Sequence, residues 1–246
     1  MIKVLKTKSS LALARQQLRN RGLDFTNPEK LGLWRRLFRI RFRSSPPIPD
    51  EIKSWDVVEM LEIIERHASD RKTPILDLGC FNSEILYALH ALGYRKLAGC
   101  DLNPQCRWMG FWHRIKYVVS DLTRTPFPDK SFGALTSVSV IEHGVDLSRM
   151  AEEAARLLRP GGVLLLTTDF DSSGNSHDIP NDFRVFNQSW QIFNPESMSK
   201  MVEVFRDAGF RLLAPDSLDM THDERPINWN RHDYTFALVA FVREGN

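Results

Sequence analysis

The sequence predicts an α/β fold whose mostly parallel sheet has helices on both faces. From Pro74 onward, short apolar runs typical of strands alternate with helical patterns, as in successive β-α-β units. Acids follow three of these runs in turn, at Asp77, Asp101 and Asp121. Because the carboxyl ends of parallel strands meet at one edge of a sheet, the three acids predict a crevice that can hold a ribose and an adenine.

The hydrophobic pattern predicts seven strands and four helices. The strands are expected at 74–79, 96–102, 116–122, 132–140, 162–169, 210–215 and 234–242. The helices are expected at 55–67, 85–92, 147–158 and 195–208. We expect Asn82 or Ser83 to cap the second helix and Asp146 the third. Asn194 with Pro195 at the first helical position opens the fourth.

The composition bounds the class of protein. At 246 residues, 42% hydrophobic and 26% charged, the chain fits one α/β domain with an extension. No apolar run approaches the ~20 residues that span a bilayer, and the N-terminus lacks the pattern of a signal peptide. The three cysteines, Cys80, Cys100 and Cys106, have no metal-ligand spacing. We therefore expect a reduced, cytoplasmic protein.

Basic residues are concentrated near the N-terminus. Residues 1–50 carry 12 Lys and Arg against 3 Asp and Glu, whereas the remaining residues carry 21 against 28. Because the proline-rich stretch 44–49 cannot continue a helix, we divide the chain into a basic extension, 1–50, and a domain, 51–246. Segment 31–43 mixes apolar residues with five arginines. We favour a lid or packing helix here; peripheral membrane contact and nucleic-acid binding are the alternatives.

Six motifs in a fixed order give the segment from Pro74 to Asp169 a family resemblance. They are DLGC at 77–80, the acid Asp101, SDL at 120–122, PFPDKSF at 126–132, SVSVIEH at 137–143 and RLLRPGGVLLLTTD at 156–169. With this order and spacing, the segment resembles the class I S-adenosylmethionine (SAM)-dependent methyltransferases of the small-molecule, biosynthetic type. The resemblance implies a Rossmann-like sheet of seven strands whose last strand, 234–242, is antiparallel.

SAM is the cofactor that the resemblance implies, and its chemistry suggests a role for several residues. Asp101 is placed to accept both ribose hydroxyls, and Leu102 to pack on the adenine. Asp121 and the Leu122 N–H are placed to meet the adenine amino group and ring. Gly79 lets the backbone approach the ligand. The remaining expected cofactor contacts are Asp77, which would orient the amino-acid end, Cys80, Phe81 and Ser139.

The turn after the first strand departs from the family pattern. Phe81 and Ser83 stand where the family usually has glycines, and Gly133 stands where it often has an aspartate. A catalytically silent, methyltransferase-like binding module is therefore an alternative. A dinucleotide dehydrogenase is excluded, because this turn reads GCFNSE and lacks the glycines of G-x-G-x-x-G.

Three residues are candidates for catalysis: Glu142, His143 and Asp169. Methyl transfer is an in-line displacement, in which positioning supplies on the order of 7–11 kcal/mol and a general base typically ~10²–10⁴-fold. His143 is the candidate base, with an architectural role for the Glu142-His143 pair as the alternative. Asp169 begins an acidic loop, with His177, Asp178 and Asp182 behind it, where an acceptor is expected. A polar loop is favoured there over a metal site, so no metal is assigned.

Segment 222–234 carries the prediction of the acceptor. Its Trp, Asn, Arg and His residues combine an aromatic face with polar donors, which suits a polyol or sugar; a hairpin stabilised by its own hydrogen bonds is the alternative. We therefore predict O-methylation of a sugar or other small biosynthetic acceptor. An RNA methyltransferase that uses the basic arm is the less favoured enzyme, and the sequence carries no signal for an oligomeric state.

Overall fold

The computed structural model describes residues 1–26, 50–109, 115–173, 184–185, 188–215 and 218–245. Segment 31–43 and the proline-rich boundary at 44–49 lie outside the described residues, as do His177, Asp178 and Asp182. The division of the chain at residue 50 therefore stays a prediction.

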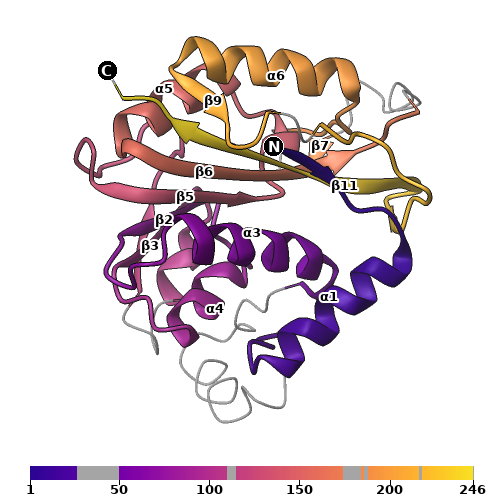
Figure 1. Ribbon diagram of the computed structural model, residues 1–246, viewed down its shortest axis with the longest axis horizontal. Coiled ribbons are helices and arrows are strands. Elements are labelled where there is room, and N and C mark those ends of the chain that lie inside the picture. Colours follow the sequence, from indigo (N-terminus) through magenta and orange to yellow (C-terminus); the bar gives the residue numbers. More distant parts are fainter. Residues whose placement is uncertain (27–49, 110–114, 174–183, 186–187, 216–217, 246) are drawn as a thin grey trace.

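A single twisted sheet forms the centre of the molecule (Figure 1). Its main path runs in the order β1-β11-β6-β5-β2-β3-β4. The strands of this path are β1 (Ile2–Val4), β2 (Ile75–Leu78), β3 (Leu97–Asp101), β4 (Lys116–Val119), β5 (Phe132–Val138), β6 (Leu158–Phe170) and β11 (His232–Arg243). The strands from β6 to β4 are parallel, and β11 is antiparallel to β6. The predicted Rossmann-like fold with an antiparallel last strand is confirmed.

The outer edge of β11 is shared by three short strands. β10 (Ile227–Trp229), β1 and β9 (Phe210–Leu212) each pair antiparallel with a different stretch of β11. All seven predicted strands are present, but the one expected at 210–215 is shorter. β1 and β10 were not predicted, because three-residue strands leave no readable alternation. The sheet therefore has nine strands instead of seven. A separate two-stranded pair is formed by β7 (Arg184–Val185) and β8 (Gln188–Ser189).

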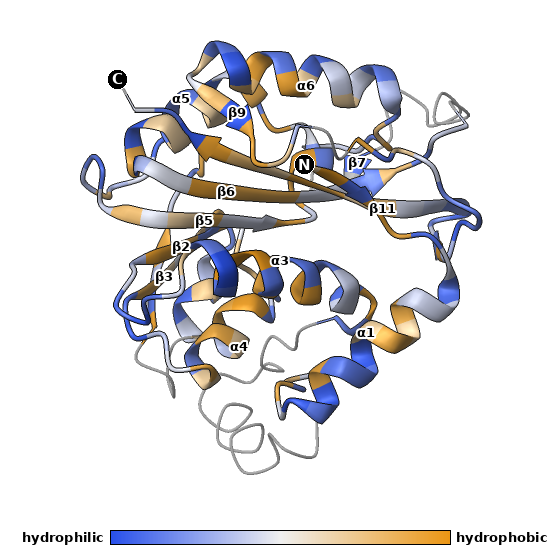
Figure 2. Ribbon diagram, in the orientation of Figure 1, coloured by the Kyte–Doolittle hydropathy of each residue, from blue (hydrophilic) through white to orange (hydrophobic). Residues whose placement is uncertain are grey.

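Helices cover both faces of the sheet, as predicted. On one side lie α1 (Lys8–Asn20), α3 (Ser54–His67) and α4 (Ile85–Ala91); on the other lie α5 (Leu147–Leu157) and α6 (Pro195–Asp207) (Figure 1). Each layer has its own apolar core, and Figure 2 shows the apolar residues gathered on the strands and on the helix sides that face them. No helix of the described residues is long and apolar enough to cross a membrane.

The helix ends follow local chemistry in two cases and depart from it in a third. The Asp146 side chain caps α5, and Asn194 forms a capping box with Ser197 at the start of α6, behind Pro195. α4 instead begins after Glu84, which makes no side-chain cap hydrogen bond. The prediction that Asn82 or Ser83 caps this helix is therefore wrong by one or two residues; the turn that precedes α4 is longer than expected.

The start of the chain is part of this fold. β1 extends the sheet, and α1, which sequence reasoning did not identify, packs against α3. Leu5, Leu18 and Leu23 are buried in the same apolar core as α3 and α4. An ion pair between Arg21 and Glu65, 2.8 Å apart, also joins the two helices. β1 is thus part of the sheet, and α1 lies on the same side of the sheet as α3, the helix that leads into β2.

A candidate cofactor crevice and an adjoining polar pocket

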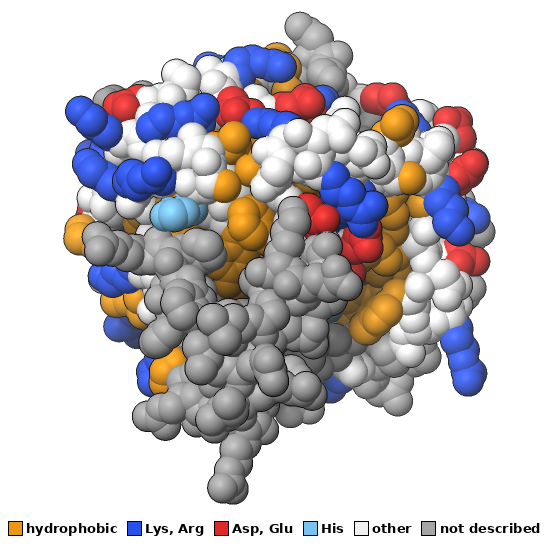
Figure 3. All heavy atoms as spheres, turned by 90° about the horizontal axis from the view of Figure 1, so that it is seen from below, with side chains coloured by type: hydrophobic (Ala, Val, Ile, Leu, Met, Phe, Trp, Pro, Cys, Tyr) orange, Lys and Arg blue, Asp and Glu red, His pale blue; other side chains and the backbone are white. Residues whose placement is uncertain are grey.

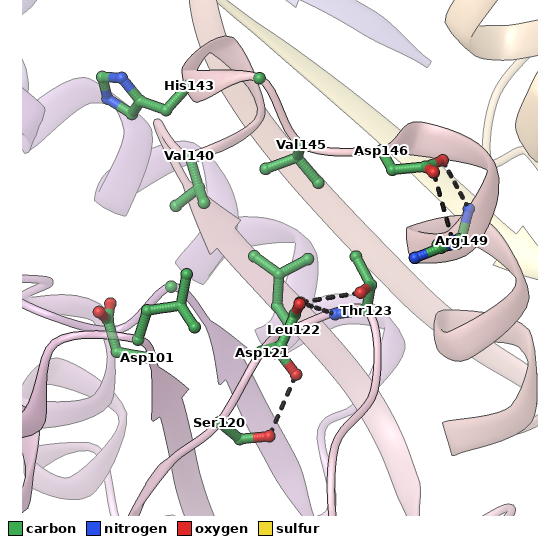
Figure 4. Close-up of a pocket in the computed structure, with 13 residues that line it drawn as sticks. Asp101, Ser120, Asp121, Leu122, Thr123, Val140, His143, Val145, Asp146 and Arg149 are labelled. Atoms are coloured by element: carbon green, nitrogen blue, oxygen red, sulfur yellow. Dashed lines mark hydrogen bonds and ion pairs between the residues drawn. The ribbon is translucent and has the colours of Figure 1, made fainter. Parts of the chain in front are cut away.

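The carboxyl ends of β2, β3 and β5 border a crevice of about 310 Å³. Figure 4 shows Asp101, Asp121 and Leu122 on one side and Val140, His143 and Val145 on the other. The residues predicted for the cofactor that line it are Gly79, Asp101, Leu102, Asp121 and Leu122. The topology thus brings together three segments that lie far apart in the chain.

Asp101 is held at the end of β3 by backbone hydrogen bonds. Its Oδ2 accepts from the Phe81 N–H at 2.9 Å, and its Oδ1 accepts from the Asn103 N–H at 2.7 Å. Burial raises the pKa of this carboxyl, and the two backbone donors oppose the rise. Beside it, the Leu102 side chain is 63% exposed. An oriented carboxylate next to an unusually exposed apolar side chain suits a ribose diol with a base packed beside it.

Asp121 lies on the next strand end and is oriented in a similar way. Its Oδ1 accepts from both the backbone N–H and the hydroxyl of Thr123, each at 2.8 Å (Figure 4). This pairing leaves its second carboxylate oxygen and the neighbouring Leu122 at the crevice. Both residues predicted for the adenine side therefore line the crevice, and their contact with an adenine stays a prediction.

Gly79 is the position where only glycine fits. Its φ is +77°, a conformation that side chains disfavour, and a Cβ there would lie 2.4 Å from a methyl group of Val140. Its N–H donates to the Cys100 carbonyl at 2.8 Å, which joins the turn to β3. The backbone can therefore approach a ligand closely at this point.

Other predicted cofactor residues support the crevice from behind. Asp77 and Cys80 are fully buried. The Asp77 Oδ1 accepts from the Thr136 hydroxyl at 2.7 Å, whereas its Oδ2 accepts no hydrogen bond from the described residues. Burial raises the pKa of Asp77 to about 7, against the effect of the nearby Thr136 and Ser83 hydroxyls. An orphaned buried carboxylate oxygen beneath the glycine turn fits a polar ligand group above it.

A second, polar pocket of about 180 Å³ adjoins the crevice, and His143 lines both. Its walls come from the short helix η1 (Glu51–Lys53), the end of β5, the short helix η3 (Ile141–His143), β6, β10 and β11. The lining residues are Asp50, Ile52, Lys53, Ser139, Glu142, His143, Asp169, Trp229 and Tyr234. Ser139, predicted as a cofactor contact, thus lines this pocket.

Asp169 has a carboxylate oxygen available in this pocket. The side chain is 3% exposed, and its Oδ2 accepts from the Trp190 indole N–H at 2.9 Å. Its Oδ1 accepts no hydrogen bond from the described residues and lies 3.8 Å from the Lys53 Nζ. Burial raises the pKa of Asp169, and the Lys53 charge opposes that rise. A buried carboxylate with one uncommitted oxygen is suited to accept a proton or a hydrogen bond.

Glu142 and His143 lie beside Asp169, so the three predicted catalytic residues are brought together. Burial, followed by the charge of Asp169, raises the pKa of Glu142 well above its ordinary value, and the Thr168 hydroxyl lies 3.2 Å from its Oε2. Burial, followed by the charge of Lys53, lowers the pKa of His143 to about 4. The imidazole is therefore neutral at physiological pH and is a weaker base than a carboxylate whose pKa is raised.

Sequence reasoning missed Lys53. Its ammonium donates to the Ser139 hydroxyl at 2.7 Å and lies 3.9 Å from the centre of the Phe236 ring. Asp56, one turn further along and fully buried, has a pKa raised to about 6 by burial. Lys53 precedes a helix and belongs to no motif, so no local signal marked it.

The predicted acceptor segment 222–234 contributes two aromatic walls. Trp229 is 42% exposed and packs edge-on against Trp190, with ring centres 5.0 Å apart; Tyr234 follows on β11. The segment also forms the β10–β11 hairpin, in which the Asn228 amide donates to Asp233 at 2.6 Å. The hairpin is therefore present, and the binding of a sugar or polyol by this segment stays a prediction. Among the described residues, no group of three or more His, Cys, Asp or Glu side chains is arranged to bind a metal.

Comparison with known proteins finds one family over the centre of the chain. The family described as "Methyltransferase domain" matches residues 76–166. A sterol 24-C-methyltransferase of Aspergillus fumigatus is 29% identical over 120 residues, covering 48% of this chain and 32% of that protein. A sterol 24-C-methyltransferase of Yarrowia lipolytica is 33% identical over 172 residues, covering 63% of this chain and 43% of that protein. The chain thus spans only about a third of the first of these relatives.

Solved structures share the fold at low identity. The cyclase SpnF superposes with a TM-score of 0.61 at 17% identity, covering 82% of this chain and 85% of that one. A geranyl diphosphate C-methyltransferase of Streptomyces coelicolor gives a TM-score of 0.56 at 16% identity, covering 78% of this chain and 82% of that chain. Because the fold also carries a cyclase, the architecture by itself does not determine the reaction.

Proposed function

The chain carries a class I SAM-dependent methyltransferase domain, and on that premise we propose that the protein methylates an oxygen of a small polar acceptor held in the polar pocket. SAM supplies an electrophilic methyl group on a sulfonium. The residues that would hold it are Gly79, Asp101 and Leu102, with Asp121 and Leu122 at the adenine. The shared wall at His143 places the polar pocket next to this crevice.

The observation that carries the acceptor class is the uncommitted Oδ1 of Asp169. A hydroxyl acceptor loses a proton as its oxygen attacks a methyl group, and the buried carboxylate provides a base in the pocket. Lys53 balances the charge of Asp169 at 3.8 Å. The aromatic face of Trp229 beside these polar groups suits the C–H face of a sugar or other polyol.

The pocket also argues against taking the acceptor from the relatives. Several of the matched curated proteins are sterol C-methyltransferases, whose names describe an apolar acceptor, and another is a tRNA U34 carboxymethyltransferase. Of the nine residues that line the polar pocket here, only Ile52 has an aliphatic side chain, and four are Asp, Glu or Lys: Asp50, Lys53, Glu142 and Asp169. Burying an apolar acceptor against such groups would leave them without hydrogen-bond partners, at a cost of about 1–3 kcal/mol each.

RNA is the less favoured acceptor. On the face seen in Figure 3, Lys and Arg side chains gather at the upper left, and elsewhere among the described residues they are mixed with Asp and Glu, so that no continuous basic surface crosses this face. Nucleic-acid binding depends on such a surface and weakens steeply with salt. The basic segment 31–43 lies outside the described residues, so its part in RNA binding is left to experiment.

The proposal is tested with the purified full-length protein in two steps. Calorimetric titration with S-adenosylhomocysteine (SAH) first measures the cofactor site. Turnover of SAM is then followed by SAH release with methyl glycosides and polyols, isoprenoid alcohols, sterols and short RNA as separate acceptors. We expect SAH binding, with turnover only on the sugars and polyols. Turnover on sterols or isoprenoids alone would overturn the acceptor class, and SAH binding without any turnover would favour the silent module.

Replacing Lys53 by Met is expected to shift the acidic limb of the pH profile of kcat/KM to higher pH by about 1 pH unit. Lys53 opposes the rise in the pKa of Asp169, so its loss raises that pKa further, and the ionised base forms only at higher pH. Lys53 also lowers the pKa of the neighbouring Asp56, Glu142 and His143, so in the variant the pKa of each of these groups rises in the same direction as that of Asp169. Lys53→Arg keeps the charge and should keep the wild-type limb. A limb that stays in place in Lys53→Met, or that moves to lower pH, would contradict this role.

A further inference from the structure

A buried ion cluster joins helix α1 to the turn of the cofactor crevice. Arg15 on α1 is 4% exposed, and its two Nη atoms donate to the two carboxylate oxygens of Glu84, at 3.2 and 2.9 Å. The same guanidinium donates to Asp24 at 3.3 Å. Arg15 and Glu84 are 69 residues apart in the chain, so this contact exists only in the folded protein.

Glu84 closes the turn that carries Gly79. The turn runs from Gly79 to Glu84, and α4 begins at the next residue. At its front, the Phe81 N–H donates to Asp101 on the crevice wall. At its rear, the Glu84 carboxylate is held by Arg15 and also accepts from the Phe25 N–H at 2.7 Å. The turn is therefore fastened both to the expected ribose carboxylate and to the N-terminal part of the chain.

These contacts hold a turn that has no glycine after Gly79. Asn82 adopts a φ of +63°, a conformation that a non-glycine residue adopts at a cost. Phe81 is partly buried and packs against the core shared by α1, α3 and α4. Because this turn carries side chains at Phe81 and Asn82, contacts with the rest of the protein are needed to hold it in one conformation. Glu84 supplies such a contact through its ion pair with Arg15.

The guanidinium also contacts the segment that bears Lys53 of the polar pocket. Its Nε donates to the Ser54 hydroxyl at 2.7 Å, and the Ser54 hydroxyl donates in turn to the Glu51 carbonyl. Ser54 directly follows Lys53, the residue that contacts Ser139 and Asp169. One side chain thus contacts both the segment that bears Gly79 and the segment that bears Lys53.

We propose that Arg15 is a positioning residue for the cofactor, which holds the turn from Gly79 to Glu84 in its binding conformation. This inference rests on the proposed function for the identity of the ligand. A buried ion pair often adds little net stability, because desolvation of the charges offsets their attraction. Its geometric effect is separate: without Arg15, the Glu84 carboxylate loses its ionic partner and keeps only the Phe25 N–H, so the turn from Gly79 to Glu84 is held less firmly.

The test compares SAH affinity in Arg15→Met, Arg15→Lys and Glu84→Gln with that of the wild type. Arg21→Met is the matched control, since Arg21 ties α1 to α3 through Glu65 without touching Glu84. Titrations are made well below each unfolding temperature, so that every variant is folded. We expect the Kd for SAH to rise at least about tenfold in Arg15→Met and less in Arg15→Lys, which keeps the charge but not the paired contact. In Arg21→Met we expect a Kd within about twofold of the wild type.

The outcomes separate this inference from the proposed function. Wild-type affinity in folded Arg15→Lys and Glu84→Gln would overturn the positioning role, and so would equal loss of affinity in Arg21→Met. If Arg15→Met does not fold, weakened binding in Glu84→Gln still supports the inference. A wild-type protein that binds no SAH would overturn the proposed function itself, whatever the variants do.

Discussion

Asp169→Asn is expected to lower kcat by about 10²–10⁴-fold, the contribution typical of a general base. The amide keeps the size of the carboxylate and an oxygen for the Trp190 indole, but it cannot take up the proton that a hydroxyl acceptor releases. Because Asp169 lines the polar pocket and not the cofactor crevice, the Kd for SAH should stay within about twofold of the wild type. Single-turnover kinetics with a saturating sugar or polyol, together with SAH calorimetry, measure the two effects separately.

Asp171→Asn is the matched control for this variant. Asp171 lies two residues further along and is also buried, but its carboxylate pairs with Arg225 and contacts His222 outside the polar pocket. Its replacement should leave kcat nearly unchanged at temperatures where the protein is folded. If Asp169→Asn retains wild-type turnover, the base lies elsewhere, and Glu142 and His143 become the candidates.

Asp101→Ala is expected to weaken binding of SAM and SAH at least tenfold, or about 1.4 kcal/mol. The carboxylate lines the crevice and accepts from the Phe81 and Asn103 backbones, so its loss removes an acceptor for the ribose hydroxyls and also frees the turn. Asp101→Asn keeps the shape and one carbonyl oxygen, and should fall between the wild type and Asp101→Ala. Calorimetric titration with SAH measures all three.

Asp129→Ala is a suitable control for the removal of an acid from the same domain. Asp129 pairs with Arg156 at the surface and does not line the crevice. Its variant should bind SAH as the wild type does. An unchanged affinity in Asp101→Ala would contradict the placement of the ribose at the end of β3.

Much of the crevice was predictable because its residues are set by local pattern. Asp101 and Asp121 stand at the ends of apolar runs, and Gly79 follows the first of them. In a parallel sheet, strand ends with this spacing meet at one edge, so the meeting of these acids at one crevice follows from the sequence. Glu142, His143 and Asp169 were found by the same reasoning and lie together in the structure.

The residues that were missed interact over long distances in the chain. Lys53 meets Ser139 from 86 residues away, and Arg15 meets Glu84 from 69. Neither belongs to a motif, and a lysine or arginine side chain usually remains in water. Strand β1 was missed for the same reason: its three residues form a strand by pairing with β11, which lies far away in the chain.

The sequence by itself determined the α/β architecture, the seven main strands and the acids of the candidate cofactor crevice, because periodicity and strand-end position act over a few residues. Only the tertiary structure decided that Asp169 keeps a free oxygen beside Lys53 and that α1 holds the cofactor turn through Arg15. Those contacts depend on which helix packs on which strand end, and on burial, which changes the pKa of Asp169 and His143 in opposite directions. Neither packing nor desolvation is encoded in the spacing of neighbouring residues.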